Sequence, residues 1–221
     1  MAHFTKAFVD FFKNLAANNT KAWFDAHRNT YENEVKKPFE AFVQEMIDRI
    51  ARHEPEAAIH VKEAIFRINK DIRFAKDKRP YNTHVAANIS RFGRKDKAYP
   101  GFYFQLSHTG AQIFGGAYMP ERDVLDRIRV LIAKDLLGFD KILASAAFKK
   151  HFGTLQGDAV KRIPEEWKPV YVKQPLIANK QFYYQANLPP SVVLGQKIPD
   201  RLMEIYAAGR DLNVFLRRAF A

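Results

Sequence analysis

Residues 101–118 read GFYFQLSHTGAQIFGGAY, and this stretch decides the class of fold. Two runs rich in aromatic and aliphatic side chains, 101–106 and 112–118, flank the turn residues His108, Thr109 and Gly110. Strand-forming runs around a short turn that contains glycine predict a β-hairpin. Strands this close leave no room for a crossover helix, so we expect antiparallel pairing.

Further strands are expected on both sides of this hairpin. Residues 65–68, 71–74, 83–90 and 181–188 have strand-like composition, and some of them alternate polar with apolar side chains. Gly115 and Gly116 lie inside a predicted strand, where paired glycines indicate a bulge or the close approach of another strand.

Helical periodicity marks the segments 4–15, 20–31, 38–50, 120–132, 139–148 and 199–220. Asn18 and Asn19 are a plausible stop for the first of these helices, and Thr20 is a cap for the second. Pro38 indicates either a kink or the first turn of the third helix. We therefore predict a single α+β domain over residues 1–221. Its N-terminal helices and a C-terminal helix pack around a mainly antiparallel sheet.

The composition excludes several classes of function. The 221 residues contain no cysteine, which rules out thiol nucleophiles, disulfides, Fe–S clusters and cysteine-ligated zinc. The seven histidines show no metal-binding spacing, so we expect no metal and no cofactor. No uninterrupted apolar run is long enough for a membrane span. We expect a protein of the cytoplasm that does not bind membranes.

Positive charge is concentrated in one part of the chain. Lys and Arg number 36 against 24 Asp and Glu, a formal net charge of +12. Residues 62–97 hold eleven of these cations and four acids, so this segment carries a net charge of +7. Anionic partners are therefore the first to consider.

The stretch FRINKDIRFAKDKRPYNTH at 66–84 carries the candidate site. On a strand, Arg67, Asp71 and Arg73 share one face, where two guanidinium groups bracket a carboxylate and match phosphate oxygens. Lys76, Asp77 and Lys78 follow in a loop, and His84 supplies an imidazole that titrates near neutral pH. The set predicts anion binding by the cations, with His84, Asp71 and Asp77 as candidates for acid–base chemistry. The structural alternative is an ion-pair ladder on a solvated surface.

Three stretches resemble the bacterial and fungal family known as domain of unknown function 2461 (DUF2461). They are residues 66–84, NNTKAWFDAHRNTYENEVKKPFEAF at 18–42 and GDAVKRIP at 157–164. The resemblance implies one α+β domain and assigns no activity. The family pattern RIYRDVRFSKDKTPYKTH is matched at Arg67, Asp71, Arg73, Lys76, Asp77, Lys78, Pro80, Tyr81, Thr83 and His84. It is not matched at Asn69, Ala75, Arg79 and Asn82.

Two further groups join the ligand candidates. Tyr81 belongs to the matched pattern, and Lys161 and Arg162 complete an anion pocket if the irregular segment 153–180 folds over the sheet.

Three functions remain open at this point. The first is a cleft for a small anionic ligand, phosphorylated or not, with or without acid–base chemistry. The second is a nucleic-acid-binding module, in which the basic segment is interleaved with Phe74, Tyr81, Phe92 and Tyr99. The third is an interaction protein without chemistry. A concave cluster of charges on one sheet face favours the first function, and a broad exposed stripe favours the second. The sequence does not decide whether the protein is an enzyme, nor its oligomeric state.

Overall fold

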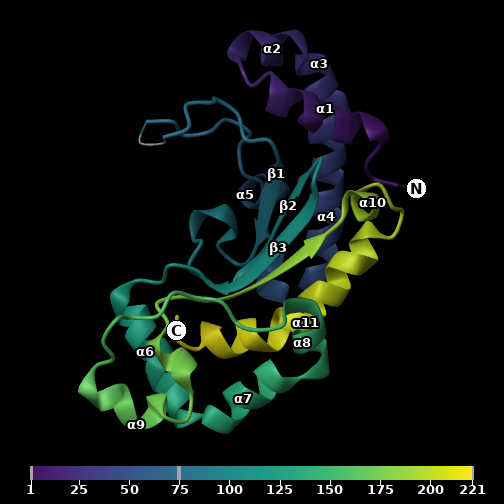
Figure 1. Ribbon diagram of the computed structural model, residues 1–221. Coiled ribbons are helices and arrows are strands. Elements are labelled where there is room, and N and C mark those ends of the chain that lie inside the picture. The colour runs from purple at the N-terminus through teal and green to yellow at the C-terminus, as the bar shows by residue number, and fades with distance from the viewer. Residues whose placement is uncertain (1, 74–75, 221) are drawn as a thin grey trace. The chain divides into compact units, whose positions relative to one another are not determined.

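A computed structural model describes residues 2–73 and 76–220 (Figure 1). It contains a four-stranded antiparallel sheet in which each strand pairs with its neighbour in the chain, in the order β1-β2-β3-β4. The strands are β1 (Val85–Ile89), β2 (Gly101–Ser107), β3 (Gly110–Ala117) and β4 (Phe182–Leu188). All four overlap strands predicted from the sequence, and the α+β class is confirmed.

Helices precede β1, lie between β3 and β4, and follow β4 in the chain. The α-helices are α1 (Lys6–Ala17), α2 (Lys21–Ala26), α3 (Arg28–Thr30), α4 (Lys37–Ala51), α5 (Val61–Ala64), α6 (Arg122–Lys134), α7 (Leu136–Ala144), α8 (Ala146–Phe152), α9 (Lys168–Tyr171), α10 (Pro190–Val193) and α11 (Ile198–Arg217). A π-helical turn, η1 (Tyr31–Lys36), joins α3 to α4. Short 3-10 turns are η2 (Pro55–Ala57), η3 (Gly93–Lys95), η4 (Glu165–Trp167) and η5 (Pro175–Ala178).

Contacts within the chain divide it into two compact units. Unit 1 comprises Met1–Lys95, Tyr103–Ile113 and Asn187–Met203. Unit 2 comprises Asp96–Phe102, Phe114–Ala186 and Glu204–Ala221. That residues 1–221 form one domain stays a prediction.

The first two helices of unit 1 begin near the predicted residues, but the helix expected over 20–31 is divided at His27 into α2 and α3. Asn18 is the C-cap of α1, and the Thr20 side chain accepts a hydrogen bond from the backbone N–H of Trp23 at 3.3 Å. The aromatic rings at helical spacing, Phe8, Phe11 and Phe12, are all buried. The buried apolar face stabilises these helices, because short helices are marginal in water on their own.

Helix α4 packs its aromatic side chains against the sheet of unit 1. The ring centroids of Phe39 and Phe42 lie 6.1 Å and 5.6 Å from that of Phe104 on β2. Pro38 lies in the first turn of α4, which follows the π-helical turn η1 directly. Of the two predictions for Pro38, the first turn of the helix is therefore confirmed.

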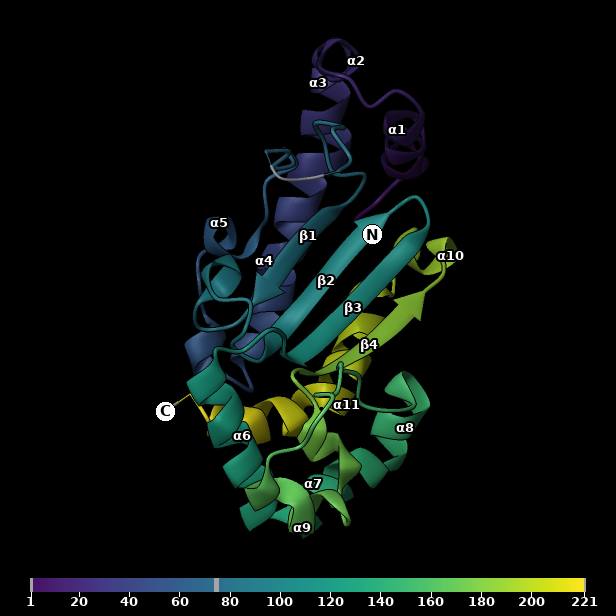
Figure 2. The ribbon, with the colours of Figure 1, turned by 60° about the vertical axis from the view of Figure 1, so that its left-hand side comes forward.

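The opposite face of the sheet in unit 1 is more polar than the face that packs against α4. Along β2, Phe104 and Leu106 are buried, whereas Tyr103, Gln105 and Ser107 alternate with them and are half-buried. Figure 2 shows α4 behind β1 and β2, so the view is onto the sheet face that α4 does not cover. We call this surface the open face; it carries Tyr103, Gln105 and Ser107 from β2 and Gln112 from β3.

Unit 2 contains a fully buried asparagine on α11. The Asn213 Oδ1 accepts from the backbone N–H of Gly116 at 2.8 Å. Its Nδ2 donates to the carbonyl of Gly101 at 3.0 Å and to the Tyr184 hydroxyl at 3.2 Å. We call these residues, with Gly115, the Asn213 cluster.

Gly115 and Gly116 lie where β4 approaches closely. A Cβ atom on Gly115 would lie 2.1 Å from the Tyr184 hydroxyl, and one on Gly116, whose φ is +92°, would lie 2.2 Å from the Phe182 carbonyl oxygen. The predicted close approach of another strand is confirmed.

One prediction about the helices of unit 2 was wrong in detail, and one buried residue was not anticipated. The segment 139–148 spans two helices, because the Ser145 hydroxyl accepts from the Phe148 N–H and begins α8. On α6, Ile128 and Ile132 are buried as expected, but Arg129 is buried with them. The Arg129 Nε donates to the Ile177 carbonyl at 3.1 Å, and its guanidinium also pairs with Asp126.

Candidate functional site

Residues 66–73 and 76–84 form the two arms of an irregular hairpin in unit 1, and we call the segment 66–84 the cationic hairpin. Its two arms are joined by backbone hydrogen bonds from Lys70 N–H to the Pro80 carbonyl and from Asn82 N–H to the Ile68 carbonyl, each 2.8 Å long. Its base is joined to β1 by the N–H of Phe66, which donates to the Ala86 carbonyl at 2.9 Å.

The strands predicted at 65–68 and 71–74 are not formed as regular strands. Only single bridges occur, between Ile65 and Ala87 and between Asn69 and Tyr81. Asp71 gives one physical reason, because its carboxylate accepts from the backbone N–H of Arg73 two residues on, at 3.2 Å. Such local bonds compete with the ladder of a sheet. The strand face expected to present Arg67, Asp71 and Arg73 together is therefore absent, and Phe74 lies outside the described residues.

The cationic hairpin is anchored to α2 through Tyr81. The Asn19 side chain donates to the Tyr81 carbonyl at 2.9 Å and accepts from the Tyr81 N–H at 3.1 Å. The Tyr81 ring stacks on Phe24, with centroids 4.1 Å apart and planes 14° apart. Tyr81 is 7% exposed, so its ring is occupied by packing within the protein.

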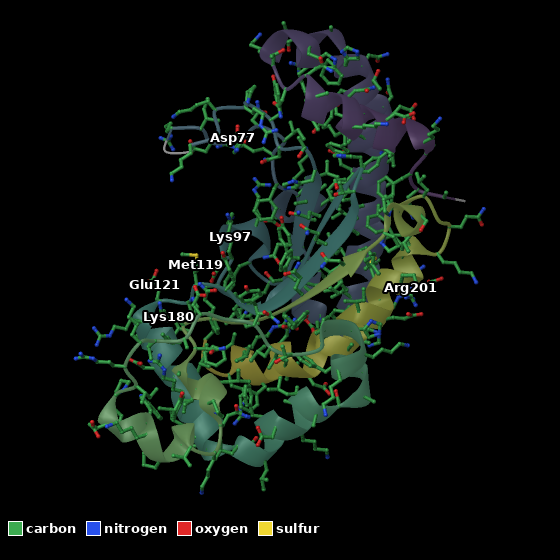
Figure 3. The ribbon with its side chains drawn as sticks, in the orientation of Figure 1. Asp77, Lys97, Met119, Glu121, Lys180 and Arg201 are labelled. Atoms are coloured by element: carbon green, nitrogen blue, oxygen red, sulfur yellow. The ribbon has the colours of Figure 1, made fainter. Side chains whose placement is uncertain are left out.

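Both carboxylates of the hairpin are engaged by arginines two residues further on. Asp71 accepts two side-chain hydrogen bonds from Arg73, at 3.1 Å and 2.8 Å. Asp77, which Figure 3 shows on the hairpin, binds the Arg79 guanidinium in the same way and also pairs with Lys70 at 2.9 Å. The repeated Asp-x-Arg spacing thus builds two exposed, bidentate ion pairs.

These contacts keep the carboxylates ionised. Hydrogen bonds from the Arg73 side chain and backbone lower the pKa of Asp71 to about 2. Bonds from Arg79 and Lys70 hold the pKa of Asp77 well below its ordinary value. A carboxylate of such low pKa is a weak base at neutral pH, so the observed contacts suit orientation of the cations better than proton transfer.

The remaining candidates of the hairpin differ in how they are held. The Lys78 ammonium donates to the Ile72 carbonyl at 3.0 Å. Arg67 and Lys76 are exposed, and neither side chain forms a hydrogen bond or ion pair with another described residue, although the Arg67 carbonyl accepts from the Asn82 side chain. His84 is half-buried just before β1, and burial lowers its pKa below the ordinary value, which leaves the imidazole neutral at pH 7.

Four of the predicted binding residues lie outside the hairpin: Lys161, Arg162, Phe92 and Tyr99. Lys161 and Arg162 are exposed residues of unit 2 and take no part in the hairpin contacts described above. Of the aromatics proposed for nucleic-acid binding, Tyr99 is buried like Tyr81, and Phe92 is 42% exposed. The Arg91 guanidinium lies over the Phe92 ring, 4.9 Å from its centroid.

Sequence reasoning missed the role of Asn19, which it interpreted only as part of a helix stop. No sequence signal pointed to this role, because the partner Tyr81 lies 62 residues away in the chain. It also missed the open face, although β2 and Gln112 show the required alternation of polar and apolar residues.

The described residues contain neither a cluster suited to a metal ion nor a helix suited to span a membrane. Within residues 2–73 and 76–220, no group of three or more His, Asp or Glu side chains is arranged to hold a metal ion. No helix in the same part has the length and apolarity needed to cross a bilayer.

The fold and the site define an α+β protein with an antiparallel sheet and an exposed cationic hairpin beside its first strand. Residues 7–215 match the family model described as "Conserved hypothetical protein (DUF2461)", and the chain belongs to this family. The resemblance drawn from the three sequence stretches is thereby confirmed. No curated protein and no solved structure matches the chain. The family description assigns no activity, so the function has to be argued from the site.

Proposed function

We propose that the protein binds the phosphate backbone of a nucleic-acid strand through the cationic hairpin. The observation that carries this proposal is the exposure of its charges. The hairpin holds six basic residues against two acidic ones, a net charge of +4. Five of the six are exposed along its two arms: Arg67, Arg73, Lys76, Lys78 and Arg79.

An extended anion fits this arrangement better than a small one. A small ligand needs polar groups that converge in a site shielded from water. The cations of the hairpin instead stay hydrated, and each contributes little to binding a single phosphate. A strand presents many phosphates, so several cations act together and release counterions from the strand.

The two Asp-x-Arg pairs support the same interpretation. Asp71 and Asp77 fix the directions of Arg73 and Arg79 without burying them. Arg67 and Lys76, which lack ion-pair partners among the described residues, are the cations best able to contact phosphate. The small-ligand cleft and acid–base chemistry by His84, Asp71 and Asp77 stay predictions, as does a purely protein-binding role.

The proposal is tested by fluorescence anisotropy with a labelled single-stranded oligonucleotide. Since each phosphate contact adds about 0.7 to the slope of log K against log salt for single strands, affinity should fall steeply between about 50 and 200 mM salt. The double variant Arg67→Gln/Lys76→Gln should weaken binding by about tenfold and make the slope shallower by about 1.4.

The matched control removes two exposed charges elsewhere. Lys149 and Lys150 of α8 are exposed, and Lys149→Gln/Lys150→Gln changes the net charge by the same amount. We expect this variant to bind like the unaltered protein. Equal losses in the two variants, or binding without salt dependence, would overturn the proposal. Equally strong competition by a mononucleotide would instead favour the small-ligand cleft.

A further inference from the structure

The open face of unit 1 carries a chain of side-chain hydrogen bonds that crosses two strands. The Tyr103 hydroxyl donates to the Gln105 Oε1 at 2.9 Å. The Gln105 Nε2 donates in turn to the Gln112 Oε1 at 2.6 Å. The chain ends at Gln112, whose Nε2 donates to no other described residue. Two fixed amides with remaining donors and acceptors are thus presented on one sheet face.

An aromatic pair joins this face to the cationic hairpin. The Phe66 ring meets the Tyr103 ring edge to face, with centroids 5.8 Å apart and planes at 64°. Both side chains are half-buried. Phe66 is the first residue of the hairpin and directly precedes Arg67. The aromatic pair therefore adjoins the first exposed cation of the hairpin. Figure 2 shows the hairpin at the end of the sheet where β1 begins and β2 finishes.

The rest of the open face is poorly suited to a purely structural role. Side chains on the opposite face, such as Phe104, Leu106 and Ile113, are fully buried and apolar. A half-buried row of tyrosine and glutamine gains little from the hydrophobic effect by comparison. Amides and aromatic rings are, however, the groups that recognise unpaired bases.

We infer that the open face binds the bases of a single-stranded nucleic acid whose phosphates lie along the cationic hairpin. This inference rests on the proposed function and adds the strandedness of the ligand and the position of its bases. Charge complementarity selects the occupant, because the adjoining hairpin carries a net charge of +4. A base stacks on the ring of Tyr103 or Phe66 and pairs its edge with the amide of Gln112. A duplex cannot offer this contact, because its bases are stacked on one another.

The test compares two labelled strands of equal length, one with bases and one made entirely of abasic sites. The unaltered protein should bind the base-containing strand about tenfold more tightly, since stacking contributes substantially for each base. Gln112→Ala and Tyr103→Leu should each remove most of that difference. Neither variant should alter binding of the abasic strand.

Controls keep the outcome specific to the open face. Gln44 on α4 is exposed, and its side chain donates to Asp48 on its own helix, so Gln44→Ala is a matched glutamine control that should bind both strands normally. Circular dichroism checks folding. If Tyr103→Leu does not fold, Gln112→Ala, at the end of the hydrogen-bond chain, still decides the question.

Failure of this inference is distinguishable from failure of the proposed function. Equal affinity for the two strands, or full base preference in Gln112→Ala, would overturn base binding while the hairpin proposal stands. If binding does not depend on salt and is not weakened by Arg67→Gln/Lys76→Gln, both the proposed function and this inference are overturned. Tighter binding of a duplex than of the single strand would also contradict the assignment of the open face.

Discussion

The Asn213 cluster of unit 2 and the cationic hairpin of unit 1 use polar groups in opposite ways. Asn213 is fully buried, and its side chain forms hydrogen bonds with Gly116, Gly101 and Tyr184. The hairpin keeps its arginines exposed and pairs them with neighbours two residues away. Buried hydrogen bonds contribute to stability because breaking them leaves unsatisfied groups, whereas exposed pairs are replaced by water. Stability and ligand binding should therefore respond to different substitutions.

Asn213→Ala should have the largest effect on stability. It leaves the Gly116 N–H and the Gly101 carbonyl without their partner in the interior, and we expect a loss of about 3 kcal/mol in the free energy of unfolding. Urea unfolding followed by Trp167 fluorescence in a Trp23→Phe background reports on unit 2. A loss below about 1 kcal/mol would show that water or a rearranged neighbour replaces these bonds.

Asn19→Ala should have the next largest effect, because Asn19 is the one buried polar anchor of the hairpin described above. Losing the two bonds to the Tyr81 backbone should cost about 2 kcal/mol. It should also speed proteolytic cleavage within residues 66–84, since the two bonds that fix the Tyr81 backbone beside α2 are then lost. Trp23 fluorescence in a Trp167→Phe background measures the first effect. Unchanged cleavage would contradict the anchoring role.

His84 should make stability depend on pH over a limited range. Burial lowers the pKa of His84 in the folded protein below the ordinary value of about 6.5, so the unfolded chain binds the proton more readily. The stability from neutral His84 is then present above about pH 6.5 and is lost as the pH falls through the folded-state pKa. His84→Gln should flatten this part of the pH profile in urea melts. An unchanged profile would show that His84 is not its source.

Arg73→Ala should have the smallest effect on stability. The ion pair with Asp71 is exposed, with 77% of the Arg73 side chain accessible, so water replaces the lost contact. We expect a urea midpoint indistinguishable from that of the unaltered protein, together with weaker and less salt-dependent binding of a single strand. A large shift in the midpoint would show that the hairpin depends on this pair for its fold, and the contrast with Asn213 would disappear.

Local pattern was sufficient for most of the architecture. The strand-forming runs 101–106 and 112–118 around the turn at His108 predicted a hairpin, and Thr20 predicted the start of α2. The same reasoning failed at residues 71–73, the described part of the strand predicted at 71–74, because Asp71 bonds the backbone of Arg73 and no regular strand forms there. Periodicity records which side chains are apolar, and it does not record whether an acidic side chain will compete with the backbone ladder.

Asn19 and Asn213 show that burial and hydrogen-bond partners depend on the tertiary structure, whereas composition and periodicity can be read from the sequence. The sequence by itself determined the order of helices and strands, the absence of cysteine chemistry and the concentration of charge in one segment. It did not distinguish Asn19 or Asn213 from a solvated asparagine, because their partners lie far away in the chain. Asn19 bonds a residue 62 positions away, and Asn213 bonds residues 97 and 112 positions away. Only folding brings such groups together and removes the water that would otherwise satisfy them, so burial and partnership at these positions are tertiary properties.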